Sequence, residues 1–258
     1  MGPAHVVGAA VIDGSGRAPN NLDITVENGH ITRLGASGAH GERPDAKGPT
    51  MAPGLIDAHV HLGLSSPIRP NFSFRMSAAR ITADIFATAS ATLGAGFTTV
   101  RDAGGIDGGV VTAIAKGKAR GPRALSCGPA QCRTGGHGHC GAEGEPTELW
   151  SSHHIAGLCA LSMRAGNADD LRHNVREAFR RGATVLRLCV TGGVVGAHDR
   201  LTGTRFTVEE IAVALQGTAA RNTCVTVHAH HNETYEMRSR PGRAVSSTAP
   251  ASTNPQRP

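Results

Sequence analysis

From residue 54 onward, the chain alternates between short apolar runs typical of strands and longer runs typical of helices. The strand-like runs begin near residues 54, 97, 123, 184 and 225, and polar residues follow each of them. This alternation predicts a parallel α/β architecture, either a closed barrel or an open sheet. In both folds the carboxyl ends of the strands meet at one rim, where active sites assemble.

The first of these runs holds two histidines at strand spacing. Pro53 and Gly54 favour a turn, and apolar side chains then alternate with polar ones over residues 55–61. Side chains two residues apart in a strand point to the same face, so we expect His59 and His61 to lie parallel. Two imidazoles held in this way form half of a divalent-metal site. Alternation by chance explains the pair equally well.

A third histidine follows the fifth predicted strand. Residues 225–227 lead directly into His228, which would share a rim with His59 and His61 if all strands belong to one sheet. Three imidazoles with an open coordination position suit Zn²⁺ carrying a water of near-neutral pKa. Residues 228–231 are, by themselves, more typical of a polar strand terminus than of a metal site. Together with the first pair, they favour a metal site.

A glycine-rich loop after the third strand carries further imidazoles. Residues 135–140 read Gly-Gly-His-Gly-His-Cys, and glycines allow the backbone to come close to a ligand. A loop without function has the same composition. A structural zinc site is a separate alternative, although its spacing matches no common zinc motif. Its ligands would be Cys127, Cys132, His137 or His139, and Cys140.

Two aspartates lie near the ends of the first two strands. Asp57 and Asp102 could each orient an imidazole from outside the ligand set. For Asp102, which precedes an Ala-Gly-Gly run, we favour a solvent-exposed turn residue.

Composition divides the chain into three parts. We expect an N-terminal β subdomain over residues 1–52, a barrel domain over 53–236 and a disordered tail over 237–258. The tail has almost no apolar side chains to bury. In the first part, strand-like runs cover residues 4–12, 22–27 and 30–34, with the hairpin signal Asn28-Gly29 between the last two.

Charge and composition argue against several classes of function. The formal net charge is +6, but the basic residues are scattered and aromatic residues make up only 3% of the chain, so we expect no nucleic-acid partner. No apolar run reaches membrane-spanning length, and no signal-peptide pattern is present, so we expect no membrane association. The six cysteines therefore indicate reduced thiols and a cytoplasmic location.

Taken in order, five motifs resemble the metal-dependent amidohydrolases, in particular their imidazolonepropionase and prolidase-like branch. The motifs are PGLIDAHVH from Pro53, TTVRDAGG from Thr98, GGHG from Gly135, TGGV from Thr191 and VHAH from Val227. The resemblance covers roughly residues 5–235. It implies a (β/α)₈ TIM-type barrel with a small β-sandwich. It also implies one or two divalent ions, with metal-bound hydroxide hydrolysing an amide or cyclic C–N bond.

The resemblance also implies roles for individual residues. Carried over to this sequence, His59, His61 and His228 would be metal ligands, and His137 would contact the substrate. The implied substrate is a small amide, dipeptide-like or N-acyl compound. The sequence identifies no residue as the catalytic acid or base.

Two departures from the family pattern limit what is implied. The family's fourth strand offers a lysine, carboxylated in two-metal members, where this chain has Arg187. A guanidinium stays protonated and its charge opposes a second cation, so we expect one ion, Zn²⁺, rather than two. The strand pattern also stops after the fifth strand. We therefore expect a C-terminally truncated, partial barrel with about five of eight strands.

A partial barrel has physical consequences. Its first and fifth strands would be open edges, and its inner face would lack opposite strands to pack against. We expect poor solubility, or association with another chain such as a second copy, through these edges. The tail composition suggests a reading-frame shift near Glu236. The alternative to an impaired hydrolase is a non-catalytic remnant or a metal-binding scaffold.

Overall fold

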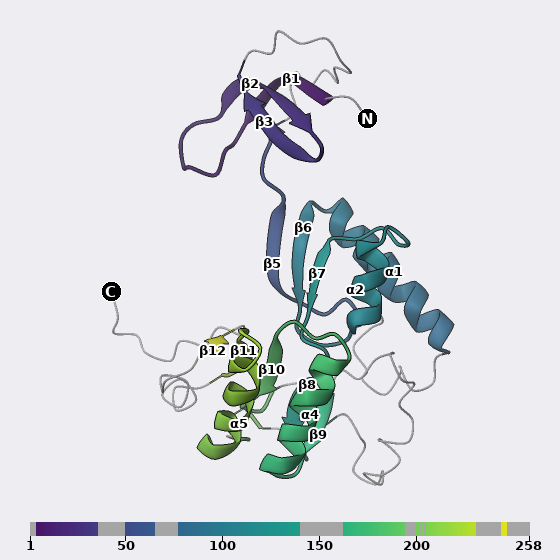
Figure 1. The fold of residues 1–258 in the computed structure, drawn as a ribbon, viewed down its shortest axis with the longest axis vertical. Helices are drawn as coiled ribbons and strands as arrows, with labels where there is room; N and C mark the ends of the chain where they lie inside the picture. Colours follow the sequence, from purple (N-terminus) through teal and green to yellow (C-terminus); the bar gives the residue numbers. More distant parts are fainter. Residues whose placement is uncertain are drawn as a thin grey trace. The chain divides into compact units, whose positions relative to one another are not determined.

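The computed structural model of the chain forms two compact units, Met1–Leu55 and Ile56–Pro258 (Figure 1). The described residues of the first unit form strands without helices, and those of the second alternate strands with helices. The structure describes residues 4–35, 50–64, 77–139, 162–193, 200–201, 203, 205–230 and 244–246.

The first unit is a four-stranded sheet with the strand order β3-β2-β1-β4. Its hairpin turn, Asn28-Gly29, has φ angles of 52° and 78°. Positive φ at both positions is the geometry of a tight hairpin turn, so the predicted hairpin is confirmed. The strands are β1 (Ala4–Val11), β2 (Asn20–Glu27), β3 (His30–Leu34) and β4 (Thr50–Met51).

This sheet has a small core and an exposed edge strand. Ala9, Val11 and Ile24 form the buried cluster. In contrast, every residue of β3 is exposed, including the apolar side chains of Ile31 and Leu34. Among the residues that the structure describes, this edge therefore presents an uncovered apolar surface.

Five strands in chain order form the frame of the second unit, and all five lie where the sequence predicted them. Three of them form a sheet with the order β5-β6-β7, and the other two, β10 and β11, are neighbours in a second sheet. The amide of Thr184 donates to the carbonyl of Ser126 over 2.8 Å and joins the end of the third strand to the segment before the fourth. The five strands are β5 (Leu55–Val60), β6 (Phe97–Asp102), β7 (Arg123–Ser126), β10 (Leu186–Cys189) and β11 (Val225–His228).

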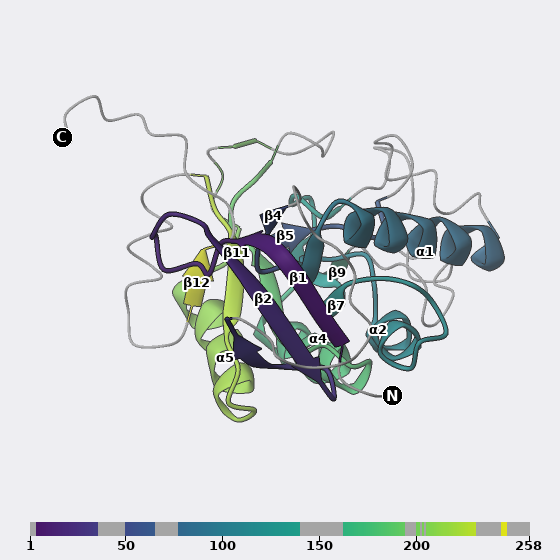
Figure 2. The same cartoon turned by 90° about the horizontal axis from the view of Figure 1, so that it is seen from above.

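Three short strands extend the second sheet, whose order is β12-β11-β10-β8-β9. Two of them, β8 (Ala130–Arg133) and β9 (Ser162–Ala165), pair with each other in parallel. The third, β12 (Ala244–Ser246), runs parallel to β11 and lies beside it in Figure 2.

Strand β12 changes two of our expectations. Its three residues belong to the segment 237–258, for which composition predicted disorder; the rest of that segment lies outside the described residues. The fifth strand, β11, is consequently paired on both sides rather than open. The physical reason is that unpaired N–H and C=O groups of a strand bind another backbone with little regard to its side chains.

In the described part of the chain, four helices connect the strands, and their starts follow the sequence signals. Asn167 accepts a hydrogen bond from the amide of Asp170, and Thr207 and Glu210 form the predicted capping box. No helix in the described part of the chain is long and apolar enough to cross a membrane. The helices are α1 (Ala78–Gly94), α2 (Gly108–Ala115), α4 (Ala168–Arg180) and α5 (Val208–Ala219).

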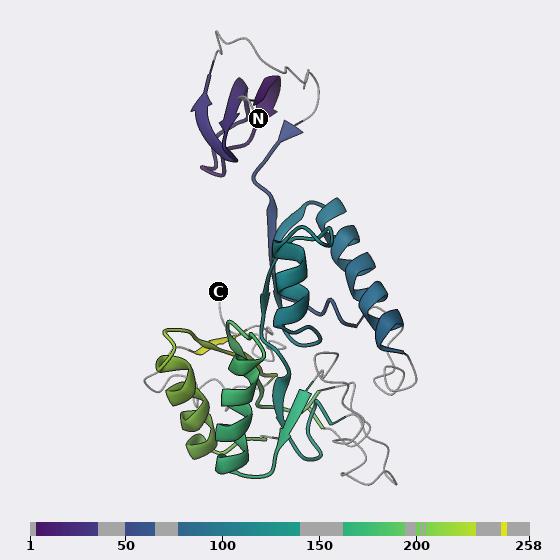
Figure 3. The same ribbon diagram turned by 45° about the vertical axis from the view of Figure 1, so that its right-hand side comes forward.

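The helices pack on one face of the strands and leave the other face for polar side chains. Helices α1 and α2 lie on one side of β5, β6 and β7 (Figure 3). Helices α4 and α5 lie side by side, with α4 against β8 and β9 and α5 against β11. On β10, Leu186 and Leu188 are fully buried in the core that these last two helices cover. Because side chains alternate along a strand, Arg187 points to the opposite face.

Candidate metal and substrate site

His61 follows β5 directly, and the loop after β6 fixes its ring. Its Nδ1 donates to the carbonyl oxygen of Gly104 over 2.8 Å. A carbonyl only accepts, so the proton lies on Nδ1 and the lone pair on Nε2. Burial also lowers the pKa of His61 to about 4, which keeps the ring neutral at pH 7. His61 therefore presents a nitrogen suited to a metal ion.

Asp102, at the end of β6, is fully buried rather than solvent-exposed, so our preferred interpretation of this residue was wrong. Its carboxylate accepts hydrogen bonds from the amides of Leu62 (2.7 Å), Gly104 (3.0 Å) and Ile106 (3.3 Å). These three donors replace the water that the carboxylate loses on burial. In the sequence, the tight Ala-Gly-Gly turn that follows Asp102 was the missed signal for its burial, because the amides of such a turn need an acceptor. Asp102 thereby holds the Gly104 carbonyl that orients His61.

His59 lies on the same face of β5 as His61, as predicted from their spacing. The two ring centroids are 5.3 Å apart, with an angle of 66° between the ring planes. The backbone amide of His59 donates to Asp57 over 2.9 Å. Asp57 therefore accepts a hydrogen bond from the backbone of its own strand.

Arg187 lies between two of the predicted ligands. It is only 2% exposed, and its guanidinium nitrogens are 3.1 Å from Nε2 of His59 and 3.4 Å from Nδ1 of His228. A guanidinium can only donate, so both ring nitrogens must accept and carry their lone pairs toward it. The structure thus brings His59 and His228 to the two terminal nitrogens of one guanidinium.

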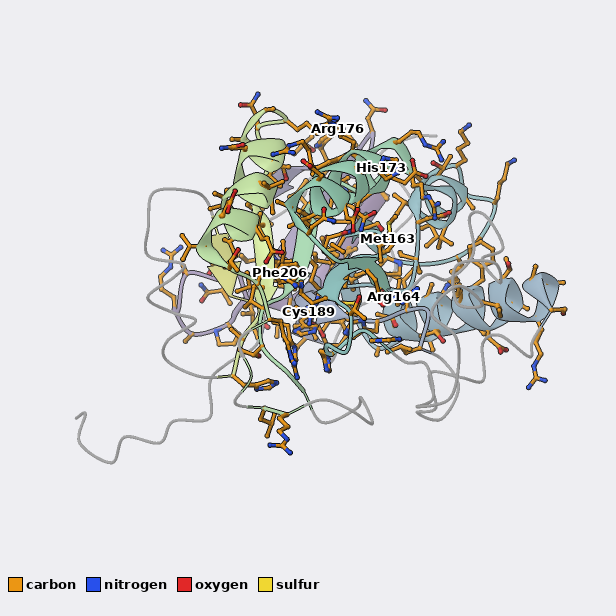
Figure 4. The ribbon with its side chains drawn as sticks, turned by 90° about the horizontal axis from the view of Figure 1, so that it is seen from below. Met163, Arg164, His173, Arg176, Cys189 and Phe206 are labelled. Carbon is orange, nitrogen blue, oxygen red and sulfur yellow. The ribbon has the colours of Figure 1, made fainter. Side chains whose placement is uncertain are left out.

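His228, at the end of β11, sits in a stack of imidazoles. The ring of His137 is parallel to it, with centroids 4.0 Å apart and planes at 7°, and His230 packs edge-on at 4.4 Å. Burial lowers the pKa of His228 to about 2, and the nearby His137 and Arg187 act in the same direction. The ring is therefore neutral, as its hydrogen bond to the guanidinium requires. Cys189, labelled in Figure 4, is its register partner on β10.

Gly193 explains how His137 reaches this position. A Cβ atom added at Gly193 would lie 2.0 Å from Nδ1 of His137. Only glycine allows the backbone to come this close to the ring. The glycines after β10 thus accommodate a neighbouring imidazole, a role that single-sequence reasoning did not find because the two residues are far apart in the chain.

The second imidazole of the glycine-rich loop has a local role. Nδ1 of His139 accepts a hydrogen bond from the amide of Gly135 over 2.8 Å. Cys127 and Cys132 are buried, and Cys140 lies outside the described residues. The described residues contain no group of three His, Cys, Asp or Glu arranged to hold an ion, so nothing there supports the structural zinc alternative.

The donors suit one divalent ion but not two. The predicted ligands are neutral imidazoles, and those of His61, His59 and His228 each have an assigned lone pair. However, the described residues form no ready-made ion site, because the permanent charge of Arg187 stands between His59 and His228. A two-ion centre would place a further cation against that charge.

Comparison of the chain with known proteins identifies a matching family. Residues 50–247 match the profile described as "Amidohydrolase family". Ochratoxinase from Aspergillus niger is 29% identical over 195 residues, covering 70% of this chain and 39% of the ochratoxinase. A dihydroorotase from Geobacter sp. (strain M21) is 29% identical over 248 residues, covering 89% of this chain and 55% of the dihydroorotase.

Solved structures support the fold. A crystal structure of a prolidase complexed with N-methylphosphonate-L-proline superposes with a TM-score of 0.85 at 27% identity, covering 93% of this chain and 59% of that chain. A second amidohydrolase structure gives a TM-score of 0.82 at 28% identity, with the same coverage. The fold is thus an α/β partial (β/α)₈ barrel with a small N-terminal β subdomain, as predicted. The chain spans between about two fifths and three fifths of the length of these relatives.

Proposed function

This chain belongs to the amidohydrolase family, and on that premise we propose that it is a hydrolase acting on an amide or cyclic C–N bond. The observation that carries this proposal is the gathering of imidazoles around one cation position. His59 and His228 direct their lone pairs to the same guanidinium, and His137 stacks on His228. Motifs that are distant in sequence supply these residues.

We propose that His59, His61 and His228 hold a single divalent ion, with Zn²⁺ as the metal. Members of the family generally use divalent metals, and neutral imidazoles are suitable zinc ligands. When bound, such an ion polarises a carbonyl group and lowers the pKa of a bound water. The protein's own contribution is to fix the tautomers. Gly104 does this for His61, and Arg187 does it for the other two rings.

The proposed substrate is a small amide, dipeptide-like or N-acyl compound, and His137 is proposed to contact it. Relatives named as ochratoxinase, dihydroorotase and prolidase support a small-molecule substrate, and the prolidase structure holds a proline derivative. His137 supports the assignment by its position, since its ring lies against His228. Asp102 is bound by three amides, and we assign it no proton transfer.

A second function is favoured by one specific observation. Arg187 lies where it engages two of the three proposed ligands, which would weaken metal binding and impair turnover. The alternative is therefore a non-catalytic member of the family, either a remnant or a metal-binding scaffold.

The experiment that separates these functions combines zinc analysis with a substrate screen. Full-length protein would be loaded with zinc, freed of excess metal and tested on acyl dipeptides and N-acyl amino acids. Zinc retention with hydrolysis supports the enzyme, and zinc retention without hydrolysis supports the scaffold. Absence of zinc binding overturns the ion site. His61→Ala should lose zinc, whereas the control His139→Ala, whose ring accepts from Gly135 in the loop, should keep it.

We also propose a cytoplasmic location and association through a sheet edge. Cys127 and Cys224 are free thiols, as expected in a reducing compartment. Strand β5 is an edge of its three-stranded sheet and exposes the apolar side chain of Ile56. Such an edge favours pairing with another chain, including a second copy. Light scattering of the full chain would test this association.

A further inference from the structure

We propose that the guanidinium of Arg187 is the resident cation of this site and competes with a divalent ion for His59 and His228. The inference rests on the proposed function, because it takes these histidines as ligands of the ion. It goes further by naming what fills the position between them. It also predicts that the chain's metal affinity is set by a residue that is not itself a ligand.

The contacts of Arg187 are those of a cation held by ligands. Two different guanidinium nitrogens approach two imidazole nitrogens, at 3.1 Å from Nε2 of His59 and 3.4 Å from Nδ1 of His228. Neither nitrogen can be protonated while it accepts from a guanidinium. A metal ion bound at these two nitrogens would require the same unprotonated state. Arginine and ion therefore need the same lone pairs.

The fold keeps this guanidinium in place. Leu186 and Leu188, on either side of Arg187, are fully buried in the core beneath α4 and α5. In the parallel ladder, Arg187 pairs with Thr226 and Cys189 pairs with His228. A shift of β10 that moved the arginine backbone would thus break both the ladder and the core. Only rotation of the side chain can release the two histidines.

The charge of Arg187 also bears on the third proposed ligand. The ring centroid of His61 lies 5.3 Å from that of His59, which the guanidinium contacts. An ion bound next to an undisplaced guanidinium would meet strong like-charge repulsion in this buried setting. Metal binding is therefore coupled to displacement of Arg187, and its removal should strengthen metal binding.

The test is a zinc titration of the full chain against a chelator of known affinity. Arg187→Met removes the charge while keeping an unbranched side chain, and we expect it to bind zinc at least about tenfold more tightly than the unchanged chain. Arg101→Met is the matched control, because Nε of Arg101 donates to the carbonyl of Ala58 over 2.8 Å rather than to an imidazole. It should leave zinc affinity unchanged. Equal affinity of the unchanged chain and Arg187→Met would overturn the proposal.

A second measurement needs no substitution. In metal-free protein, ¹⁵N NMR should show Nε2 of His59 and Nδ1 of His228 as unprotonated, and zinc should shift the guanidinium signals of Arg187. Zinc that shifts both histidines but leaves the Arg187 signals unchanged would refute the competition. Failure of the proposed hydrolase gives a different result. In that case Arg187→Met binds zinc more tightly but cleaves no compound in the screen.

Discussion

The two ends of the barrel fragment hold their histidines by different means. At the β5–β6 end, the backbone orients His61, whose ring donates to a carbonyl, and Asp102 accepts from three amides. His59, on the same strand, is the exception, because its ring faces Arg187. At the β10–β11 end, side chains hold one another through Arg187, His228 and His137. A ring oriented by the backbone leaves its other nitrogen for an external ion. A ring oriented by a guanidinium is already bound to a cation.

The largest expected effect is at the backbone-held end. Asp102→Ala would leave three buried amides without their acceptor, so we expect a loss of about 3–5 kcal/mol in the free energy of unfolding. Urea denaturation of the full chain would measure it. Asp57→Ala is the control, since the amide of His59 alone is assigned to that carboxylate, and it should cost about 1 kcal/mol. Equal losses in the two variants would show that the three amide contacts of Asp102 add nothing to the stability of the β5–β6 end.

The same carboxyl group predicts a pH dependence. Burial raises the pKa of Asp102 to about 6 from 3.8, although its three hydrogen bonds act in the opposite direction. Because the folded-state pKa is the higher one, the contribution of Asp102 to stability is complete below about pH 4. It declines as the pH rises through about 6. Relative to Asp102→Asn, the unchanged chain should lose about 2 kcal/mol between pH 4 and pH 7. A pH-independent difference between the two would contradict this.

The side-chain-held end should be sensitive to a single methyl group. In Gly193→Ala the new Cβ would clash with the ring of His137, and we expect a cost of about 1–2 kcal/mol with displacement of that ring from His228. Ring-current shifts in the NMR spectrum would report the displacement. Gly94→Ala, at the end of α1 where the nearest atom to an added Cβ is 3.9 Å away, should be neutral or slightly stabilising. An undisturbed stack in Gly193→Ala would rule out close packing there.

The smallest effect concerns reactivity rather than stability. Burial raises the pKa of the Cys127 thiol to about 12, whereas Cys224, just before β11, is half-exposed. Only the thiolate reacts with iodoacetamide. At pH 8, native Cys127 should therefore react at least about 100-fold more slowly than Cys224. Mass spectrometry of the labelled peptides would measure both rates. Comparable rates would show that the β7 end opens readily.

Local patterns predicted the elements of this fold well. The spacing of His59 and His61, the hairpin at Asn28-Gly29 and the capping box at Thr207 each depend on neighbours within a few residues. Parallel strands with polar ends predicted that His228 would share a rim with the first pair, and the structure links it to His59 through Arg187. The sequence also indicated that Arg187 opposes a second ion.

Contacts between distant segments could not be predicted in the same way. Asp102 is buried because amides from two separate loops surround it, and a single sequence does not show those donors. The stack of His137 on His228 depends on the absence of a side chain at Gly193. The pairing of β12 with β11 uses backbone groups, which composition does not reveal.

That backbone pairing makes the edge next to β11 a practical site for protein engineering. The register of Val225 with Ala244 and of Val227 with Ser246 depends on main-chain atoms, so the segment can be rewritten as a short recognition tag without removing the ladder. A synthetic peptide of the same length could replace this segment and pair with the same edge of β11. The edge would then serve as a site for reversible attachment of a peptide.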